Sequence, residues 1–474
     1  MGVKRNFVYS TILTCSGYVF SFITYPYVSR VLGVENIGIC NFVTSIVQYF
    51  LLFSTMGIAS VGTREIAKCN GDNERLSQCF SSLFWINMIA TAIVAVVYVI
   101  CIFYIPKLYP YRKLLYIGLL QIVMTPFLVE WFFKGIENFK YITLRSLAVK
   151  IVYVVSVFLF VQGPGDYDLY FFLSCAMMVA NAVFNWWYKR KFVTLKFRNI
   201  EFRPYLKGFF VLGIYMLLTS MYTTFNTAYL GIVGGNIEVG YYSTAMKLQS
   251  IILAIYTAFT GVMIPRMSAL IGQGNKSEVS RLIYKSFDFL FVFSIPLVMY
   301  TMIFAPQIIR ILSGSGYENA VTPMRIVMPL IFIIGIEQIL VLQILMPFKE
   351  DKAILVNSII GALIGVISNL IIVPIFKANG SAVVSLLSDF SVLLSAYYFV
   401  SKRYGRVIPF LSLLKNILLM LPICWIMYLI SIGLPLLASI CCSAIVLVLY
   451  CWFIQCYVLH DELFLSLLSK YKRR

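Results

Sequence analysis

Lys247 stands inside a long apolar stretch, where an uncompensated charge is costly. It follows Gly240 by seven residues in "GYYSTAMKLQSIILAIYTAF", which places it roughly 10 Å into a helix that rises about 1.5 Å per residue. One charge at the centre of a membrane helix costs about 2.5 to 3.5 kcal/mol on insertion scales. We predict that Lys247 binds or gates an anionic ligand, and the alternative is an ion pair with an acidic neighbour.

Three arginines complete this cationic set. Arg30 stands near the outer end of the first apolar stretch, Arg64 at the inner end of the second, and Arg266 at the inner end of the eighth. No acidic residue lies deep in the first three stretches. A cavity lined by these side chains would be positive and would attract an anion strongly, because its dielectric is low. The alternative for each arginine is that its guanidinium extends into the lipid headgroups.

Three acidic residues also fall within apolar stretches. Glu337 in "FIIGIEQILVLQ" and Asp389 in "VSLLSDFSVLLSAYY" are deep, and either could bind a coupling proton or sodium ion, or form a buried ion pair. Glu130 in "FLVEWFFKG" stands about one turn from the inner end of its stretch. It is a third candidate for ion coupling, with a structural cap or ion pair as the alternative.

Other chemistry finds little support in the residues present. The eleven cysteines are scattered without zinc-type spacing. The single histidine, His460, lies on the C-terminal tail, so a histidine metal site or a Ser-His relay is not available within the membrane. The longest outward connection, near Pro306 to Pro323, has about 18 residues. We expect no enzyme, no cofactor and no metal, although a membrane enzyme such as a polysaccharide polymerase remains an alternative.

The elements that must position these charges are membrane helices. The chain is 61% hydrophobic and 12% charged, with a mean hydropathy of +0.89, far above soluble domains. Transmembrane barrel strands would alternate in segments of about ten residues, whereas apolar stretches of about 20 residues predict spanning helices. We therefore predict an all-α polytopic fold with fourteen spans, near residues 8–28, 38–61, 81–105, 114–133, 143–161, 168–188, 208–231, 240–264, 284–305, 324–346, 353–376, 380–400, 411–432 and 436–459.

The basic residues predict the orientation of these spans. The net charge is +19, and about 30 of the 38 Lys and Arg fall on one side when the N-terminus is placed in the cytoplasm. Both termini are therefore predicted to be cytoplasmic. The richest cluster, "WWYKRKFVTLKFRNIEFRPYLK", links spans six and seven. Because positive-inside topology already explains it, we expect no nucleic-acid partner.

An internal repeat relates the two halves of the chain. "RVLGVENIGICN" and "YLGIVGGNIEVGYYS" each have Leu-Gly at a helix end and a second glycine that opens the next span. Gly38 and Arg64 are 26 residues apart, as are Gly240 and Arg266. Six spans precede the repeat, so both halves enter the membrane in the same orientation, which predicts two pseudo-symmetric six-helix lobes around a central cavity and alternating access. The predicted units are an N-lobe (1–190), a basic cytoplasmic linker (191–207), a C-lobe (208–402), and two further helices with a basic tail (403–474).

Several motifs in order resemble those of a known family. They are "PYVSRVLGVENIG", "GTREIA", "WFFKGIENFKYITLRS", "VGYYSTAMK" and "MIPRMSAL". Together they resemble bacterial Wzx-type polysaccharide flippases, over residues 6 to 400. The resemblance implies two lobes plus two accessory helices in the bacterial cytoplasmic membrane. It also implies the transfer of an undecaprenyl-pyrophosphate-linked oligosaccharide repeat unit between leaflets, for surface polysaccharide biosynthesis.

The resemblance also bears on residues and partners. Arginines in the first, second and eighth helices face the cavity in the lipid II branch, so Arg30, Arg64 and Lys247 are the nearest positions here. Family members often read Asp-Lys at the end of span seven, whereas this chain has Asn226 and Ala228, which puts a coupling role of that pair in doubt. Besides membrane lipids, a polysaccharide polymerase and a chain-length regulator are candidate partners. The alternative function is a multidrug or other small-molecule antiporter of the same superfamily, which should carry acidic residues in its first lobe.

Overall fold

The protein is a bundle of membrane-length helices. A computed structural model describes residues 3–69, 71–198 and 200–459, and every regular element among them is a helix. Within these ranges, twelve helical stretches are long and apolar enough to cross a bilayer. The predicted fold class, an all-α polytopic membrane protein, is confirmed.

Two of the twelve stretches are long enough to cross twice. The first runs over Val8–Lys68 (61 residues), and α15 (Asp351–Tyr404) has 54 residues. A straight helix of 54 residues would measure about 80 Å, more than twice the roughly 30 Å hydrocarbon core. The chain turns back at a residue with non-helical dihedrals in each of them, at Gly33 (φ 77°, ψ 170°) in the first and at Lys377 (φ 48°, ψ −123°) in α15. The crossings therefore agree with the fourteen predicted from sequence.

Other predicted spans are crossings built from shorter helices. Met56 (φ 35°) and Val129 (φ 36°) adopt the left-handed conformation, which side chains rarely occupy. Met56 separates α1 from α2 within the predicted span 38–61, and Val129 precedes α5 within the predicted span 114–133. The hydrophobic pattern predicted the length of these crossings. It did not predict the breaks at Met56 and Val129, because both side chains are apolar.

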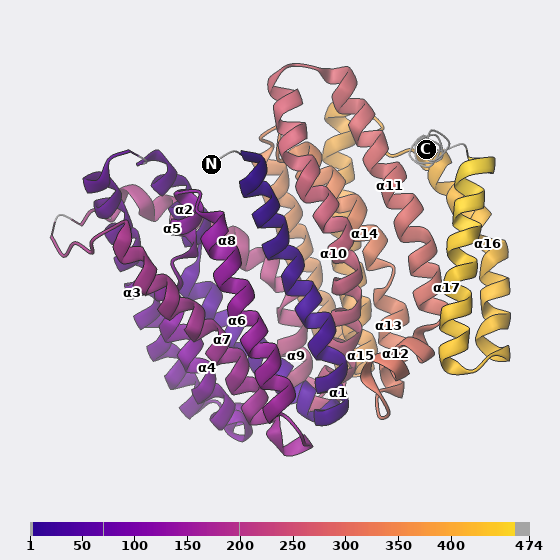
Figure 1. Cartoon of the computed structure of the whole chain (residues 1–474), viewed down its shortest axis with the longest axis horizontal. Coiled ribbons are helices and arrows are strands. Elements are labelled where there is room, and N and C mark those ends of the chain that lie inside the picture. The colour runs from indigo at the N-terminus through magenta and orange to yellow at the C-terminus, as the bar shows by residue number, and fades with distance from the viewer. Residues whose placement is uncertain (1–2, 70, 199, 460–474) are drawn as a thin grey trace.

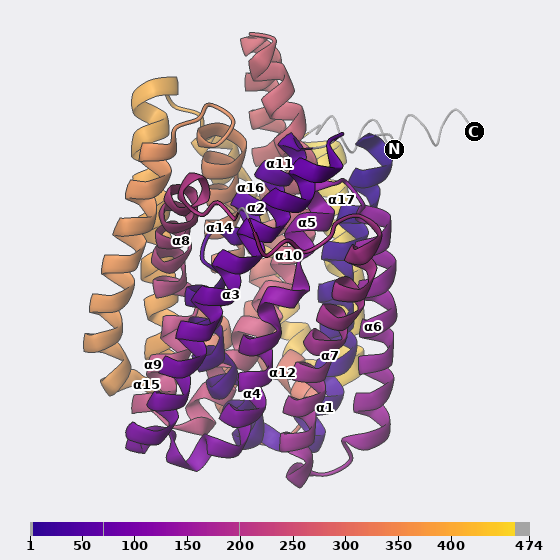
Figure 2. The same ribbon diagram turned by 90° about the vertical axis from the view of Figure 1, so that its left-hand side faces the viewer.

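The helices form two groups, which we call the first and second repeats (Figures 1 and 2). In Figure 1 most helices of the first repeat lie to the left, and only its helix α1 is more central. Helices α16 and α17 lie at the right-hand edge. The first repeat consists of α1 (Val3–Thr55), α2 (Ile58–Lys68), α3 (Asn73–Tyr104), α4 (Arg112–Met124), α5 (Glu130–Gly135), α6 (Phe139–Phe160) and α7 (Tyr167–Tyr188). The second consists of α8 (Arg203–Thr223), α9 (Phe225–Val233), α10 (Asn236–Gly272), α11 (Lys276–Ile303), α12 (Ala305–Ser313), α13 (Val321–Val327), α14 (Leu330–Gln338) and α15, followed by α16 (Phe410–Gly433) and α17 (Leu436–Phe453).

One end of the bundle carries most of the positive charge, and we call it the basic end. It holds the start of α1, the α2–α3 turn and the connection from α7 to α8, at the top of Figure 1. That connection contributes Lys189, Arg190, Lys191 and Lys196. The opposite end holds the Gly33 bend and α12. The segment 306–323, expected to be the longest connection on that side, is largely helical because it contains α12.

The two repeats cross through a reciprocal pair of glycines. A Cβ on Gly38 would stand 1.8 Å from the carbonyl oxygen of Asn236, and one on Gly240 would stand 2.3 Å from the carbonyl oxygen of Val34. Gly38 and Gly240 each follow a left-handed glycine by five residues, Gly33 (φ 77°) or Gly235 (φ 88°). Equivalent positions of the two halves therefore touch each other's helix start, as a pseudo-twofold axis requires. Only glycine permits backbones to approach this closely.

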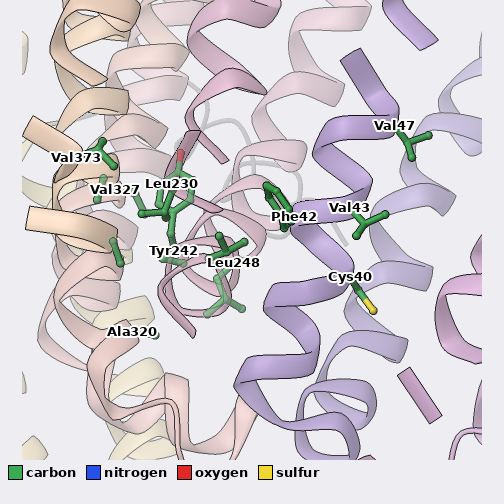
Figure 3. Close-up of a cluster of buried hydrophobic side chains, with 14 of the residues drawn as sticks. Cys40, Phe42, Val43, Val47, Leu230, Tyr242, Leu248, Ala320, Val327 and Val373 are labelled. Carbon is green, nitrogen blue, oxygen red and sulfur yellow. The ribbon is translucent and has the colours of Figure 1, made fainter. Parts of the chain in front are cut away.

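A shared apolar core surrounds this crossing (Figure 3). Phe42 of α1 is buried with Leu230 of α9 and with Tyr242 and Leu248 of α10. Its ring packs on Gly231, where any Cβ would overlap the ring. Figure 3 shows Phe42 on the side of α1 that faces α9 and α10, while Val43 points to the other side. The repeats are thus joined by side-chain packing as well as by the glycine contact.

Candidate functional site

Lys247 lies on the face of α10 that packs against α1. Gly240 touches Val34, and Thr244 forms a 2.6 Å hydroxyl hydrogen bond with Tyr25, both on α1. Residues three and four apart on a helix share a face, so Lys247 continues this row one turn toward the basic end. Its side chain is half-buried. The sequence-predicted cation is therefore positioned at the junction of the two repeats.

The ammonium group of Lys247 is not neutralised by any neighbour that the structure describes. Its backbone carbonyl accepts a hydrogen bond from Ser250 Oγ at 2.9 Å. Across residues 3–69, 71–198 and 200–459, no hydrogen bond or ion pair of the ammonium is found. The alternative expected from sequence, an ion pair with an acidic neighbour, is absent from that part of the chain. An unpaired charge at membrane depth is typical of a functional site.

The three arginines do not join Lys247 in one cluster. Arg64 and Arg266 are 60% exposed near the basic end, within 3.0 Å of Glu65 and 4.0 Å of Glu278, respectively. Arg30 lies toward the opposite end, three residues before the Gly33 bend, and is also exposed. Because the two ends are separated by about the thickness of a bilayer, one headgroup cannot contact all four cations at once.

Arg30 takes part in a connection between the repeats. Its guanidinium donates to the Ile311 carbonyl at the end of α12. Beside it, Ser29 Oγ donates to the Leu312 carbonyl at 3.2 Å, and Tyr317 Oη donates to the Ser29 carbonyl at 3.2 Å. These bonds attach the first half of α1 to the second repeat at the opposite end of the bundle.

Glu130 is held in an ion pair that sequence reasoning did not identify. Arg145 Nη2 of α6 lies 2.7 Å from Glu130 Oε1, and Arg145 Nη1 donates to the Asn181 carbonyl at 3.2 Å. The arginine side chain is only 5% exposed. This ion pair is the structural alternative considered for Glu130, and a role of Glu130 in ion coupling stays a prediction.

A second unforeseen cation is Lys150, one and a half turns farther along α6. Its ammonium donates to Ser16 Oγ of α1 at 2.9 Å, and the side chain is half-buried. Ser16 and Tyr25 are nine residues apart on α1, which corresponds to opposite faces of a helix of 3.6 residues per turn. Lys150 and Lys247 therefore lie on opposite sides of α1 and do not form one site.

The second repeat contains a buried polar network. Asn226 Nδ2 of α9 lies 3.1 Å from Tyr242 Oη, 2.9 Å from Ser385 Oγ and 2.7 Å from the Ser381 carbonyl. Tyr242 and Ser385 also share a 2.8 Å hydrogen bond. Asn226 is thus a neutral amide that joins α9, α10 and α15.

The two deep acids lie near this network. Asp389 follows Ser385 by one turn on α15, and Glu337 on α14 is close enough to interact with it electrostatically. Tyr222 of α8 interacts with both carboxyl groups. No salt bridge of either acid is found between residues 3 and 459 outside positions 70 and 199. Sequence placed both acids in the second half of the chain but could not show that they approach each other.

Histidine, cysteine and carboxylate groups do not assemble into a metal site within the described ranges. The cysteines of these ranges are free thiols. His460 lies outside the described residues. The arrangement therefore offers charge and hydrogen bonding, in the form of an unpaired lysine between the repeats and a carboxyl pair within the second.

Comparison with solved structures shows the same architecture at low sequence identity. A structure titled "Lipid II flippase MurJ, inward closed conformation" matches with a TM-score of 0.74 and 15% identity, over 94% of this chain and 98% of that one. An inward-facing multidrug resistance MATE family transporter of the MOP superfamily matches with a TM-score of 0.62 and 15% identity, over 86% and 96%. At this identity the likeness establishes the fold.

Curated sequences and family models give closer relationships. A "Putative O-antigen transporter" of Escherichia coli (strain K12) is 25% identical over 402 residues, covering 82% of this chain and 94% of that protein. One of the same name from Shigella dysenteriae is 22% identical over 400 residues, covering 83% and 98%. A MatE model matches residues 212–371. The model described as "Polysaccharide biosynthesis protein" matches residues 3–271, more than half of the 474 residues. The chain is therefore a member of the polysaccharide biosynthesis protein family.

Proposed function

We propose that this protein moves undecaprenyl-pyrophosphate-linked oligosaccharide repeat units from the inner to the outer leaflet of the bacterial cytoplasmic membrane. The transfer serves surface polysaccharide synthesis and proceeds by alternating access of the two repeats. The single observation that carries this proposal is the unpaired ammonium of Lys247 between the repeats. The names of the curated relatives support the substrate class.

Lys247 suits a pyrophosphate head. A phosphate oxygen would supply the counter-charge that the lysine lacks, and their attraction is stronger where water is excluded. The sugar chain would otherwise lose its hydration in hydrocarbon, which is prohibitive. In the proposed mechanism the polar head passes between the repeats while the polyprenyl tail remains in lipid.

The basic end is proposed to face the cytoplasm, with both chain termini on that side. Its clustered lysines and arginines favour this orientation. The contacts of Arg30, Ser29 and Tyr317 with the other repeat would then close the outer side. A cytoplasm-negative potential favours outward movement of an anionic head by about 2.3 kcal/mol per charge per 100 mV.

The return step is proposed to be coupled to a proton or a sodium ion at Glu337 and Asp389. Two carboxyl groups that interact electrostatically, and that have no salt bridge in the described part of the chain, favour sharing a proton or binding a cation, because like charges disfavour ionisation of both. The nearby hydrogen bonds of Asn226, Tyr242 and Ser385 join α9, α10 and α15. A change of charge on the carboxyl pair would therefore act on several helices of the second repeat. A polysaccharide polymerase and a chain-length regulator are proposed partners downstream.

The test replaces Lys247 in cells that depend on this protein for surface polysaccharide. We expect Lys247→Ala to abolish the polysaccharide and to cause the lipid-linked intermediate to accumulate on the inner leaflet, because the head loses its counter-charge. Lys247→Arg should retain activity, and both variants should reach the membrane at the normal level. Undiminished polysaccharide from Lys247→Ala would remove this residue from the mechanism.

A small-molecule antiporter of the same superfamily is the second candidate. It is favoured by the MatE match over residues 212–371. A deletion strain that becomes sensitive to cationic drugs while its polysaccharide is unchanged would support the antiporter and exclude the flippase.

A further inference from the structure

A crevice of about 630 Å³ opens between α6 and α7, away from the junction of the repeats. Its wall combines apolar and aromatic side chains, among them Leu144, Phe184 and Trp187, with the cations Lys140 and Arg145. Pockets of this size hold small organic ligands. The crevice plays no part in the transport mechanism proposed above.

The crevice faces the membrane at the level of a single leaflet. Leu144, Phe184 and Trp187 are 52%, 51% and 63% exposed, as expected for side chains that contact lipid. The lining residues on this side run from Asn138 to Val149, a length of about 16 Å along α6. This is roughly half of the 30 Å hydrocarbon core, beginning at the basic end.

Two lysines, Lys140 and Lys191, lie beside the crevice. Lys140 is exposed and has no hydrogen-bond or ion-pair partner among the residues that the structure describes. Lys191 Nζ lies 5.1 Å from the ring of Tyr188 and 6.0 Å from that of Trp187, and both rings line the crevice. Lysines beside aromatic rings at this depth favour an anionic headgroup.

A buried donor without an acceptor lies deeper in the same wall. Arg145 is 7% exposed, and its two terminal nitrogens bind Glu130 and the Asn181 carbonyl. Its Nε has no hydrogen-bond partner in the described part of the chain. Leaving such a group unsatisfied is unfavourable. Arg145 stands five residues beyond Lys140 and therefore about 7.5 Å deeper along α6. If the phosphate of a phospholipid lay at Lys140, its ester carbonyl oxygens would lie near this depth.

We propose that this crevice is a binding site for one anionic glycerophospholipid of the leaflet at the basic end. Its phosphate lies between Lys140 and Lys191, an ester carbonyl accepts from Arg145 Nε, and one acyl chain runs along Leu144 and Phe184. The exposed apolar wall continues into the lipid-facing surface of α6 and α7, so the ligand can enter sideways from the bilayer. The site does not depend on which substrate is transported.

Native mass spectrometry of the full-length protein in detergent tests the site, with phosphatidylglycerol and phosphatidylethanolamine of identical acyl chains as probes. We expect one phosphatidylglycerol to bind preferentially. The double variant Lys140→Ala/Lys191→Ala should bind it roughly 30-fold more weakly, from about 1 kcal/mol for each lysine, while phosphatidylethanolamine binding is unchanged.

A matched control removes two lysines at the same end of the molecule but outside the crevice. Lys352 and Lys402 are exposed, and Lys402 lies 5.8 Å from the Tyr398 ring much as Lys191 lies near Tyr188. Lys352→Ala/Lys402→Ala should leave the preferential binding unchanged. A third variant, Leu144→Trp, fills the exposed wall without changing the charge and should abolish the bound lipid.

Equal binding of the two lipids to the wild-type protein would overturn the proposal. So would an undiminished preference for phosphatidylglycerol in both Lys140→Ala/Lys191→Ala and Leu144→Trp. Neither result bears on the flippase proposal, because lipid-linked oligosaccharide is not present in the measurement.

Discussion

At the scale of single residues, the Arg145–Glu130 pair is a structural feature with a measurable contribution. Glu130→Gln leaves a guanidinium that is only 5% exposed without its 2.7 Å partner. Breaking fully buried pairs costs about 3 to 5 kcal/mol. We expect Glu130→Gln to lower the free energy of unfolding by about 2 to 3 kcal/mol. The loss is smaller than for a fully buried pair because the Glu130 side chain is 37% exposed. A lower midpoint of thermal unfolding in detergent would report this loss.

The matching control removes both charges together. Glu130→Gln combined with Arg145→Met should recover much of the lost stability, because no unpaired charge then remains in the protein interior. If the double variant were less stable than Glu130→Gln by the whole loss that Arg145→Met causes alone, the two residues would act independently. That result would contradict the pairing.

The interior charges were predictable from sequence to different degrees. Lys247 could be identified because it interrupts a long apolar run and lies well inside it. Arg145 and Lys150 interrupt the predicted span 143–161 in the same way, and this signal could have found them. Their partners, Glu130 and Ser16, lie on other helices. The approach of Glu337 to Asp389 is likewise tertiary, since it depends on how α14 packs against α15.

At the scale of helices, the glycine crossing between α1 and α10 is the contact most sensitive to added volume. Gly38→Ala would place a methyl group 1.8 Å from the Asn236 carbonyl oxygen, so the helices would have to separate. Overpacking of this kind costs about 1 to 3 kcal/mol. We expect Gly38→Ala to lower thermal stability and to reduce polysaccharide export in cells.

Gly261 provides a control within α10, the other helix of this crossing. A Cβ there would have no neighbour within 4 Å, and replacing glycine by alanine in a helix interior gains up to about 1 kcal/mol. Gly261→Ala should therefore be neutral or slightly stabilising. If Gly38→Ala behaved like Gly261→Ala, the close crossing would not exist in the native protein.

The spacing of residues predicted that the two halves of the chain are repeats. It predicted the residue-by-residue alignment of the halves only in part. The equal separations of Gly38 from Arg64 and of Gly240 from Arg266 identified equivalent helices. The Leu-Gly pairs suggested Gly33 and Gly231 as equivalents, whereas the backbone gives the left-handed bend to Gly33 and Gly235. Sequence similarity alone cannot distinguish neighbouring glycines, because the requirement for positive φ is a property of the folded turn.

At the scale of the whole molecule, the proposed orientation can be measured by cysteine labelling in intact cells. Arg198 lies at the basic end and Ser315 at the opposite end, and both are exposed. We expect a membrane-impermeant maleimide added outside to label Ser315→Cys but not Arg198→Cys, relative to the parent protein. Permeabilised cells should label both. The reverse pattern would place the basic end outside and contradict the positive-inside assignment.

The proposed transport requires that an anionic lipid head pass between the repeats beside Lys247. The most direct measurement reconstitutes the purified protein into vesicles with a fluorescent polyprenyl-pyrophosphate-linked oligosaccharide and follows its movement between leaflets. We predict rapid movement with the wild-type protein and with Lys247→Arg, and only the protein-free rate with Lys247→Ala. Movement by Lys247→Ala at the wild-type rate, or no movement by a folded wild-type protein, would contradict the account.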